Sequence, residues 1–191
     1  FASILLTSIL VFCFASHAIE SKNENRTLTD QLKAMADQSK LKGTSEKRKI
    51  MEDAIEQVRR DHITEKAIKV GDTLPSFTLP DVKSQKISST DLLKNGPLVV
   101  VFYRGGWCPY CNLQLHDLQK YLPEIKKLGA NLVAISPQTP DESLSTAQKD
   151  NLSFYVLSDV GSKVGKQFGL IYKLPENLKK LYKEFGIDLE K

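Results

Sequence analysis

The chain has 191 residues, of which 41% are hydrophobic and 26% charged, and its formal net charge is +4. This length and apolar content suffice for one packed domain with extensions. The lysines alternate with acidic residues, as in KKLYKE, which is typical of solvated helix faces. Because the sequence has no dense basic block with interleaved aromatic residues, we expect no nucleic-acid partner.

The first 18 residues, FASILLTSILVFCFASHA, contain no charged side chain. The run is short for a membrane span and ends in a small-x-small pattern, which predicts a secretory signal peptide cleaved after Ala18. We therefore expect an exported protein, periplasmic or secreted, without stable membrane insertion after cleavage. Cys13 would leave with the signal, since the large Phe12 disfavours a lipid anchor there. The chain begins with Phe and lacks a basic n-region, so we expect Met and that region to be missing.

Residues 19–66 are predicted to form a polar leader and a helical extension. Apolar residues recur at helical spacing from Leu28 to Met35 and again from Ile50 to Val58. Thr44 or Ser45 can cap the second helix. The pattern predicts two helices arranged as a hairpin or arm.

Residues 67–191 alternate strand and helix patterns. Alternating apolar and polar residues over 68–91 indicate short strands. Near-continuous apolar runs indicate buried strands at 98–103, 131–136 and 153–157. We expect the strand at 98–103 to be central in its sheet. Helical patterns occur at 109–127, 141–150, 162–168 and 175–186. This order predicts parallel βαβ units with right-handed crossovers.

The stretch VVVFYRGGWCPYCNLQLHDLQ carries Cys108 and Cys111, which are the cysteines left once the signal is removed. The strand is expected to end at Arg104, the two glycines permit a sharp turn, and Pro109 suits a first helical turn. Cys108 is then at the helix N-cap or just inside it, where free N–H groups and the helix dipole stabilise a thiolate. We expect an exposed Cys108 with a lowered pKa and a nucleophilic thiolate, with Arg104 adding positive charge nearby.

Cys111 starts a helical stripe that continues at 115, 118, 122 and 125. We therefore expect it to be half-buried beneath Cys108 and less acidic. An exposed acidic thiol with a shielded partner within disulfide reach is what thiol–disulfide exchange requires. Pro123 is expected to kink this helix or end it at Leu122.

Two other uses of the cysteine pair are disfavoured. A structural zinc site needs four ligands, and the other candidates, His62 and His116, are better explained as exposed histidines. A purely structural disulfide between residues three apart would constrain the unfolded chain little. The pair therefore favours a catalytic or redox role.

The segments GDTLPSFTLPD, VVVFYRGGWCPYCNLQL, LVAISPQ, SFYVLSD and GKQFGL together resemble the peroxiredoxin-like group of the AhpC/TSA (alkyl hydroperoxide reductase C/thiol-specific antioxidant) family. The resemblance spans Val70 to the C-terminus. It implies an α/β thioredoxin-like fold, with a central mixed sheet flanked by helices, and an antioxidant thiol-dependent peroxidase that needs no metal or organic cofactor. It leaves homo-oligomer formation open.

By this resemblance Cys108 holds the peroxidatic position. A hydrogen peroxide or alkyl hydroperoxide substrate would oxidise it to a sulfenic acid. Cys111 would resolve that acid into a disulfide, and a thioredoxin-like reductant would restore the dithiol.

The family carries a Pro and a Thr or Ser upstream of the peroxidatic Cys, where this sequence has Val101 and Gly105. The hydroxyl of that Thr or Ser is therefore missing. The family's later catalytic Arg also has no clear match, since Lys166 and Lys173 are the basic residues in that region. We expect Arg104 to compensate. The sequence stops before the family's closing strands, so we expect residues 67–191 to be an incomplete domain. Two alternatives stay open: an exported oxidoreductase acting on protein disulfides, and a non-catalytic thioredoxin-fold binding module.

Overall fold

The structure is a computed structural model that describes residues 27–189. The predicted signal peptide, its cleavage after Ala18 and Cys13 lie outside these residues. The chain divides into two compact units, Phe1–Leu41 and Lys42–Lys191. The first is described by α2 (Leu28–Lys42), whose start is stabilised because the Thr27 hydroxyl accepts the N–H of Asp30 at 3.2 Å. This is the first helix predicted for the extension.

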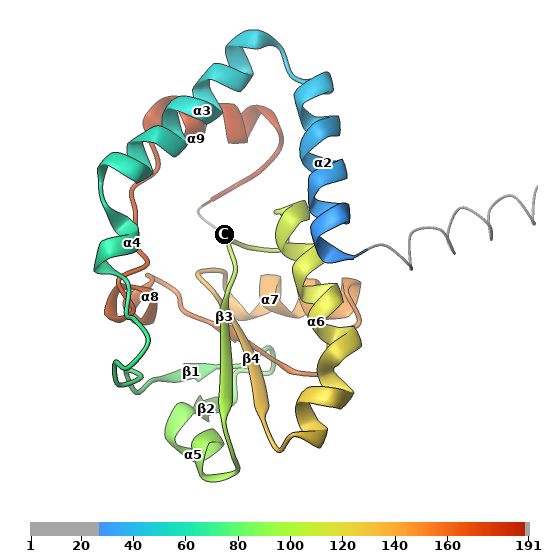
Figure 1. Cartoon of the computed structure of the whole chain (residues 1–191), viewed down its shortest axis with the longest axis vertical. Helices are drawn as coiled ribbons and strands as arrows, with labels where there is room; N and C mark the ends of the chain where they lie inside the picture. Colours follow the sequence, from blue (N-terminus) through green and yellow to red (C-terminus); the bar gives the residue numbers. More distant parts are fainter. Residues whose placement is uncertain (1–26, 190–191) are drawn as a thin grey trace, which may run out of the picture. The chain divides into compact units, whose positions relative to one another are not determined.

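The second unit alternates helices and short strands (Figure 1). Its elements are α3 (Ser45–Arg60), α4 (Ile63–Lys66), β1 (Thr78–Pro80), β2 (Lys86–Ser88), α5 (Ser89–Lys94), β3 (Leu98–Phe102), α6 (Pro109–Lys127), β4 (Asn131–Ser136), α7 (Pro140–Lys149), β5 (Tyr155–Ser158), α8 (Lys163–Gln167) and α9 (Glu176–Glu184). The strands and helices expected beyond residue 67 are present. Two short helices, α4 and α5, were not predicted.

The strands of the described residues form a parallel sheet in the order β3–β4–β5 and an antiparallel pair, β1–β2. An antiparallel bridge between Asp81 and Leu157 connects the pair to β5. The expectation that 98–103 is the central strand is wrong. In the described part of the chain β4 lies between its two neighbours and is buried from Leu132 to Ser136, whereas β3 is an edge strand that is mostly half-buried.

Successive side chains of β4 point to opposite faces of the sheet and enter different cores. Val133 and Ile135 pack with Phe77, Leu157 and Phe168 in one core. Ala134, on the other face, belongs to a core that includes Leu115 of α6 and the side chains of Cys108 and Cys111. The predicted redox pair therefore lies in the core between the sheet and α6.

A third core joins α3 to α9, which lie side by side in Figure 1. Ala54 of α3 packs with Leu178 and Leu181 of α9, and Tyr182 packs against them. The hydroxyl of Thr44 caps α3 by accepting the N–H of Lys47 at 3.3 Å, which is the cap that the sequence suggested. The second helix of the extension thus packs against the C-terminal helix.

Helix α6 covers 109–127 as expected and runs through Pro123, so of the two effects expected of Pro123, a kink or an end at Leu122, the second is wrong. Pro123 is exposed, so its ring displaces no core side chain. The helical hydrogen bonds resume beyond it, because the N–H of Leu128 donates to the carbonyl of Glu124 at 3.0 Å. Among residues 27–189, no helix has both the length and the apolar character that a membrane span requires.

Candidate active site

A tight turn connects β3 to the two cysteines. The N–H of Tyr103 still donates to Ile135 in β4, at 2.9 Å, and Gly105 then adopts a φ of 147°. A Cβ at Gly105 would lie 2.5 Å from Nε1 of Trp107, so the position requires glycine. The N–H of Cys108 donates to the carbonyl of Gly105 at 3.0 Å. Cys108 is the N-cap of α6 and Pro109 occupies its first turn, as predicted.

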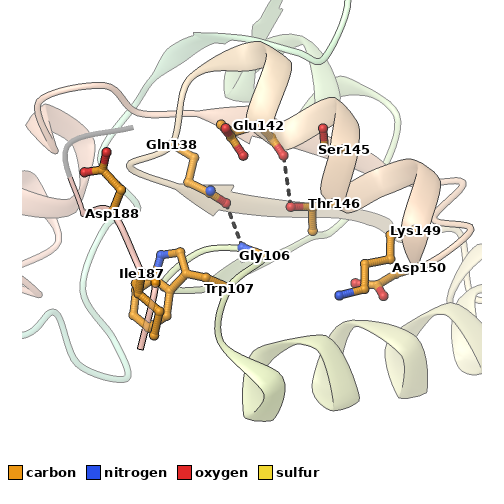
Figure 2. Close-up of a pocket in the computed structure, with 11 residues that line it drawn as sticks. Gly106, Trp107, Gln138, Glu142, Ser145, Thr146, Lys149, Asp150, Ile187 and Asp188 are labelled. Atoms are coloured by element: carbon orange, nitrogen blue, oxygen red, sulfur yellow. Dashed lines mark hydrogen bonds between the residues drawn. The ribbon is translucent and has the colours of Figure 1, made fainter. Parts of the chain in front are cut away.

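Gly106 is hydrogen-bonded to a side chain of the loop after β4 and to a side chain of α6. Its N–H donates to Oε1 of Gln138 at 2.7 Å, and its carbonyl accepts Nδ2 of Asn112 at 2.9 Å. A Cβ at Gly106 would lie 2.2 Å from Oγ1 of Thr146, which follows from how closely α7 approaches the turn. Figure 2 shows the side chains of Gln138 and Thr146 on the same side of Gly106. The sequence did not identify these supporting residues, because each lies far from the turn or bears no motif.

Both cysteines are free thiols in the described chain, and both are buried. Cys108 is 3% exposed and Cys111 9%, so the expectation of an exposed Cys108 is wrong. Trp107 packs against the cluster that holds the two sulfurs, as do Leu152 and Phe154 from the segment that precedes β5. Cys111 lies on the buried face of α6 with Leu115 and Leu122, as its spacing predicted.

The two thiols have opposite acidities. A hydrogen bond from the Cys111 thiol lowers the pKa of Cys108 to about 6, and this outweighs burial, which raises it. The backbone N–H groups of Cys111 and Tyr110 and the charge of Arg104 lower it further. The same hydrogen bond and burial raise the pKa of Cys111. The shared proton of the pair therefore favours Cys111, and the negative charge favours Cys108.

Arg104 contacts two neighbouring aromatic rings. Its Cζ is 4.5 Å from the centre of the Trp107 ring and 5.3 Å from that of Tyr182, and Nη2 donates to the Tyr182 hydroxyl at 2.6 Å. Its charge acts on Cys108, as the sequence led us to expect. Lys166 and Lys173 are exposed and line neither of the two hollows that border Trp107.

Both hollows border Trp107, next to the turn. One, of about 360 Å³, is lined by Gly106, Trp107 and Gln138 together with residues of α7 and of the segment after α9 (Figure 2). The other, of about 340 Å³, is lined by Arg104, Trp107, Gln138 and Tyr172 among others. Cys108 lines neither hollow. Trp107 borders both hollows and also packs against the cluster that holds the sulfur.

The two histidines weighed as zinc ligands do not assemble a site. Nδ1 of His62 lies 2.7 Å from Oε1 of Glu65, and His116 is exposed on α6. Among the described residues, no three His, Cys, Asp or Glu side chains are grouped to hold a metal ion.

A strand that leads through a glycine turn to two cysteines at a helix N-terminus, in a parallel βαβ sheet, defines a thioredoxin-fold thiol protein. The chain belongs to the AhpC/TSA family, whose model matches residues 70–187. The thioredoxin-like fold and the family resemblance predicted from the sequence are thereby confirmed.

Curated relatives of the chain include peroxiredoxins. The chain is 34% identical over 103 residues to peroxiredoxin Bcp of Escherichia coli K12, an alignment that covers 54% of this chain and 65% of Bcp. It is 35% identical over 113 residues to the chloroplastic peroxiredoxin Q of Sedum lineare, covering 59% of this chain and 60% of that protein. The crystal structure of peroxidoxin BcpB from Mycobacterium tuberculosis matches with a TM-score of 0.52 at 28% identity, over 54% of this chain and 67% of that one. The chain thus spans less than two thirds of the curated relatives' length.

Proposed function

We propose that the protein is a thiol-dependent peroxidase that reduces hydrogen peroxide or alkyl hydroperoxides. One observation carries the proposal: Cys108, at the N-cap of α6, shares one buried cluster with Cys111, and hydrogen bonding with Cys111 lowers the pKa of Cys108 to about 6. The thiolate is the reactive form of cysteine, and it predominates here at neutral pH. The names of the peroxiredoxin relatives support the same reaction class.

In the first step the Cys108 thiolate attacks the terminal oxygen of the hydroperoxide. An S–O bond forms, the O–O bond breaks, and the leaving alkoxide or hydroxide takes up a proton. The products are a Cys108 sulfenic acid and an alcohol or water. Arg104, whose charge lowers the pKa of Cys108 and whose guanidinium contacts Trp107, is proposed to stabilise the negative charge that develops on the leaving oxygen.

In the second step the Cys111 sulfur attacks Cys108. An S–S bond forms, the S–O bond breaks, and the thiol proton of Cys111 leaves with the hydroxyl as water. The hydrogen bond between the two side chains supports a resolving role for Cys111. A thioredoxin-like dithiol partner would then reduce the disulfide by exchange and become oxidised itself. This cycle uses neither a metal nor an organic cofactor.

Stopped-flow oxidation of the reduced protein by hydrogen peroxide and by an alkyl hydroperoxide tests the proposal. Fast consumption should be abolished in Cys108→Ser. Cys111→Ser should still react once and accumulate a sulfenic acid that a dimedone probe traps. Consumption by the wild type no faster than by an unactivated thiol, or equal rates in wild type and Cys108→Ser, would overturn the proposal.

An exported thiol–disulfide oxidoreductase is the second candidate, favoured by the direct hydrogen bond between Cys108 and Cys111 and by the absence of a hydroxyl at Gly105. Insulin reduction with a thiol donor separates the two activities. A non-catalytic binding module would leave Cys108 inert towards iodoacetamide at neutral pH.

We also propose that the protein is exported and cleaved after Ala18, since residues 1–18 have the composition of a signal peptide. N-terminal sequencing of the protein from the periplasm and the medium tests this, and a chain that keeps residues 1–18 would contradict it. The mass of the protein in solution, measured by light scattering, would show whether it forms a homo-oligomer.

A further inference from the structure

Tyr182 in α9 contacts the one arginine that flanks the cysteine turn. We infer that Tyr182 is a positioning residue: its hydroxyl and ring fix the Arg104 guanidinium against Trp107, which packs on the buried cluster that holds Cys108. The use of the Cys108 sulfur as a nucleophile rests on the proposed function. The positioning itself does not.

The contact joins residues 78 positions apart in the sequence. Nη2 of Arg104 donates to the Tyr182 hydroxyl at 2.6 Å, and the Tyr182 ring lies 5.6 Å from the Trp107 ring, centre to centre. The guanidinium thus contacts two adjacent rings, at 4.5 and 5.3 Å, and donates to a hydroxyl at one end. Such contacts restrain a side chain that otherwise has four freely rotating bonds.

The acceptor is a phenol and not a carboxylate, and this matters for the charge. Among the described residues no Asp or Glu forms a salt bridge with Arg104. A carboxylate at the same place would offset most of the positive charge that Cys108 experiences. The hydroxyl of Tyr182 orients the guanidinium and leaves its full charge available to the thiolate.

Tyr182 can act as a fixed support because α9 is itself anchored. The core of Ala54, Leu178 and Leu181 joins α9 to α3, and Tyr182 packs against it. One turn further on, Lys47 of α3 lies 3.1 Å from the Glu184 carboxylate and 5.1 Å from the Phe185 ring centre. Helix α3 therefore contributes to the site through α9, which gives the second helix of the N-terminal extension a function.

The test measures the pH dependence of iodoacetamide alkylation at Cys108, read by mass spectrometry on the reduced full chain. Tyr182→Phe keeps the ring and removes the acceptor, and should raise the midpoint by about half a pH unit, which slows alkylation at pH 6 about twofold. Tyr182→Leu removes the ring as well and should raise it by about one unit. Tyr121→Phe, an exposed tyrosine on α6, is the matched control and should leave it unchanged.

A double-mutant cycle separates positioning of Arg104 from general support of the fold. Arg104→Ala should raise the midpoint, and adding Tyr182→Phe to it should raise it no further. An unshifted midpoint in Tyr182→Phe, or the full shift of Tyr182→Phe in the Arg104→Ala background, would overturn the inference. Because no peroxide is used, slow peroxide consumption by the wild type would defeat the peroxidase proposal and leave this result standing.

Discussion

The hydrogen bond between the two thiols is the contact whose removal tests the site most directly. It is the largest cause of the lowered pKa of Cys108, and burial opposes it. In Cys111→Ala the donor is lost, while the buried position and the helix N-terminus remain. The pKa of Cys108 must therefore rise, since the burial that disfavours the thiolate is then opposed only by backbone N–H groups and Arg104.

The size of the rise follows from the strength of a hydrogen bond to a charged acceptor. Such a bond contributes about 1.5–3 kcal/mol, and about 1.4 kcal/mol corresponds to one pKa unit, so we expect a rise of about one to two units. The wild-type thiol, with a pKa of about 6, is about nine-tenths thiolate at pH 7. In Cys111→Ala the thiolate fraction at pH 7 should fall to between about one-tenth and one-half.

Absorbance of the thiolate at about 240 nm, titrated from pH 4 to 9 in the reduced protein, measures this fraction. Cys111→Ser is the matched variant, because its hydroxyl keeps a donor at the same position, and its midpoint should lie between those of the wild type and Cys111→Ala. If Cys111→Ala titrates at about pH 6 like the wild type, the helix N-terminus and Arg104 alone set the acidity. The hydrogen bond from Cys111 would then not be the cause of the low pKa.

The remaining predictions concern stability, packing and access. Because the pKa of Cys108 is about 6 in the folded protein and about 9 in the unfolded chain, the thiolate stabilises the fold fully above pH 9, and this stability is lost as pH falls through about 6. From pH 6 to 8 the free energy of unfolding of the reduced wild type should increase by at most about 2 kcal/mol relative to that of Cys108→Ser. Urea unfolding at each pH measures the difference. Gly106→Ala should cost about 1–3 kcal/mol in the same assay because its Cβ meets Thr146, and Thr146→Ala should recover most of that loss; a cost that persists would place the strain elsewhere. Trp107→Ala should speed labelling of Cys108 by a bulky maleimide more than by iodoacetamide, and equal acceleration of both would argue against shielding by Trp107.

The sequence was sufficient wherever a local pattern decides the structure. Apolar runs located β3, β4 and β5, since a buried strand needs apolar side chains on both faces. The order of two glycines, a cysteine and a proline placed Cys108 at the start of α6, because these residues restrict φ in the way that a turn and a first helical turn require. The stripe through Cys111 likewise identified the buried face of α6.

It was insufficient wherever tertiary contacts decide. The burial of Cys108 depends on Trp107 and on side chains beyond α7, and no spacing near residue 108 reports their approach. The position of Arg104 depends on Tyr182, whose helical stripe indicated only a core residue. The edge position of β3 depends on which strand lies between the others, and hydrophobicity does not distinguish an edge strand from a central one that is covered on both faces.

Burial and acidity are usually opposed in a thiol, because a low-dielectric environment disfavours the charged form. Cys108 combines the two: it is 3% exposed and its pKa is nevertheless about 6. The combination requires that donors already point at the sulfur, so that ionisation needs no solvent. The Cys111 thiol and the backbone of Tyr110 and Cys111 lower the pKa of Cys108 from within α6, and Arg104 adds its charge. A sulfur of this kind favours ionisation while its burial, to which Trp107 contributes, limits access to it. Under the proposed function, this condition suits a small peroxide in the first step, and a thioredoxin-like reductant would attack the disulfide only after the packing around Cys108 had opened.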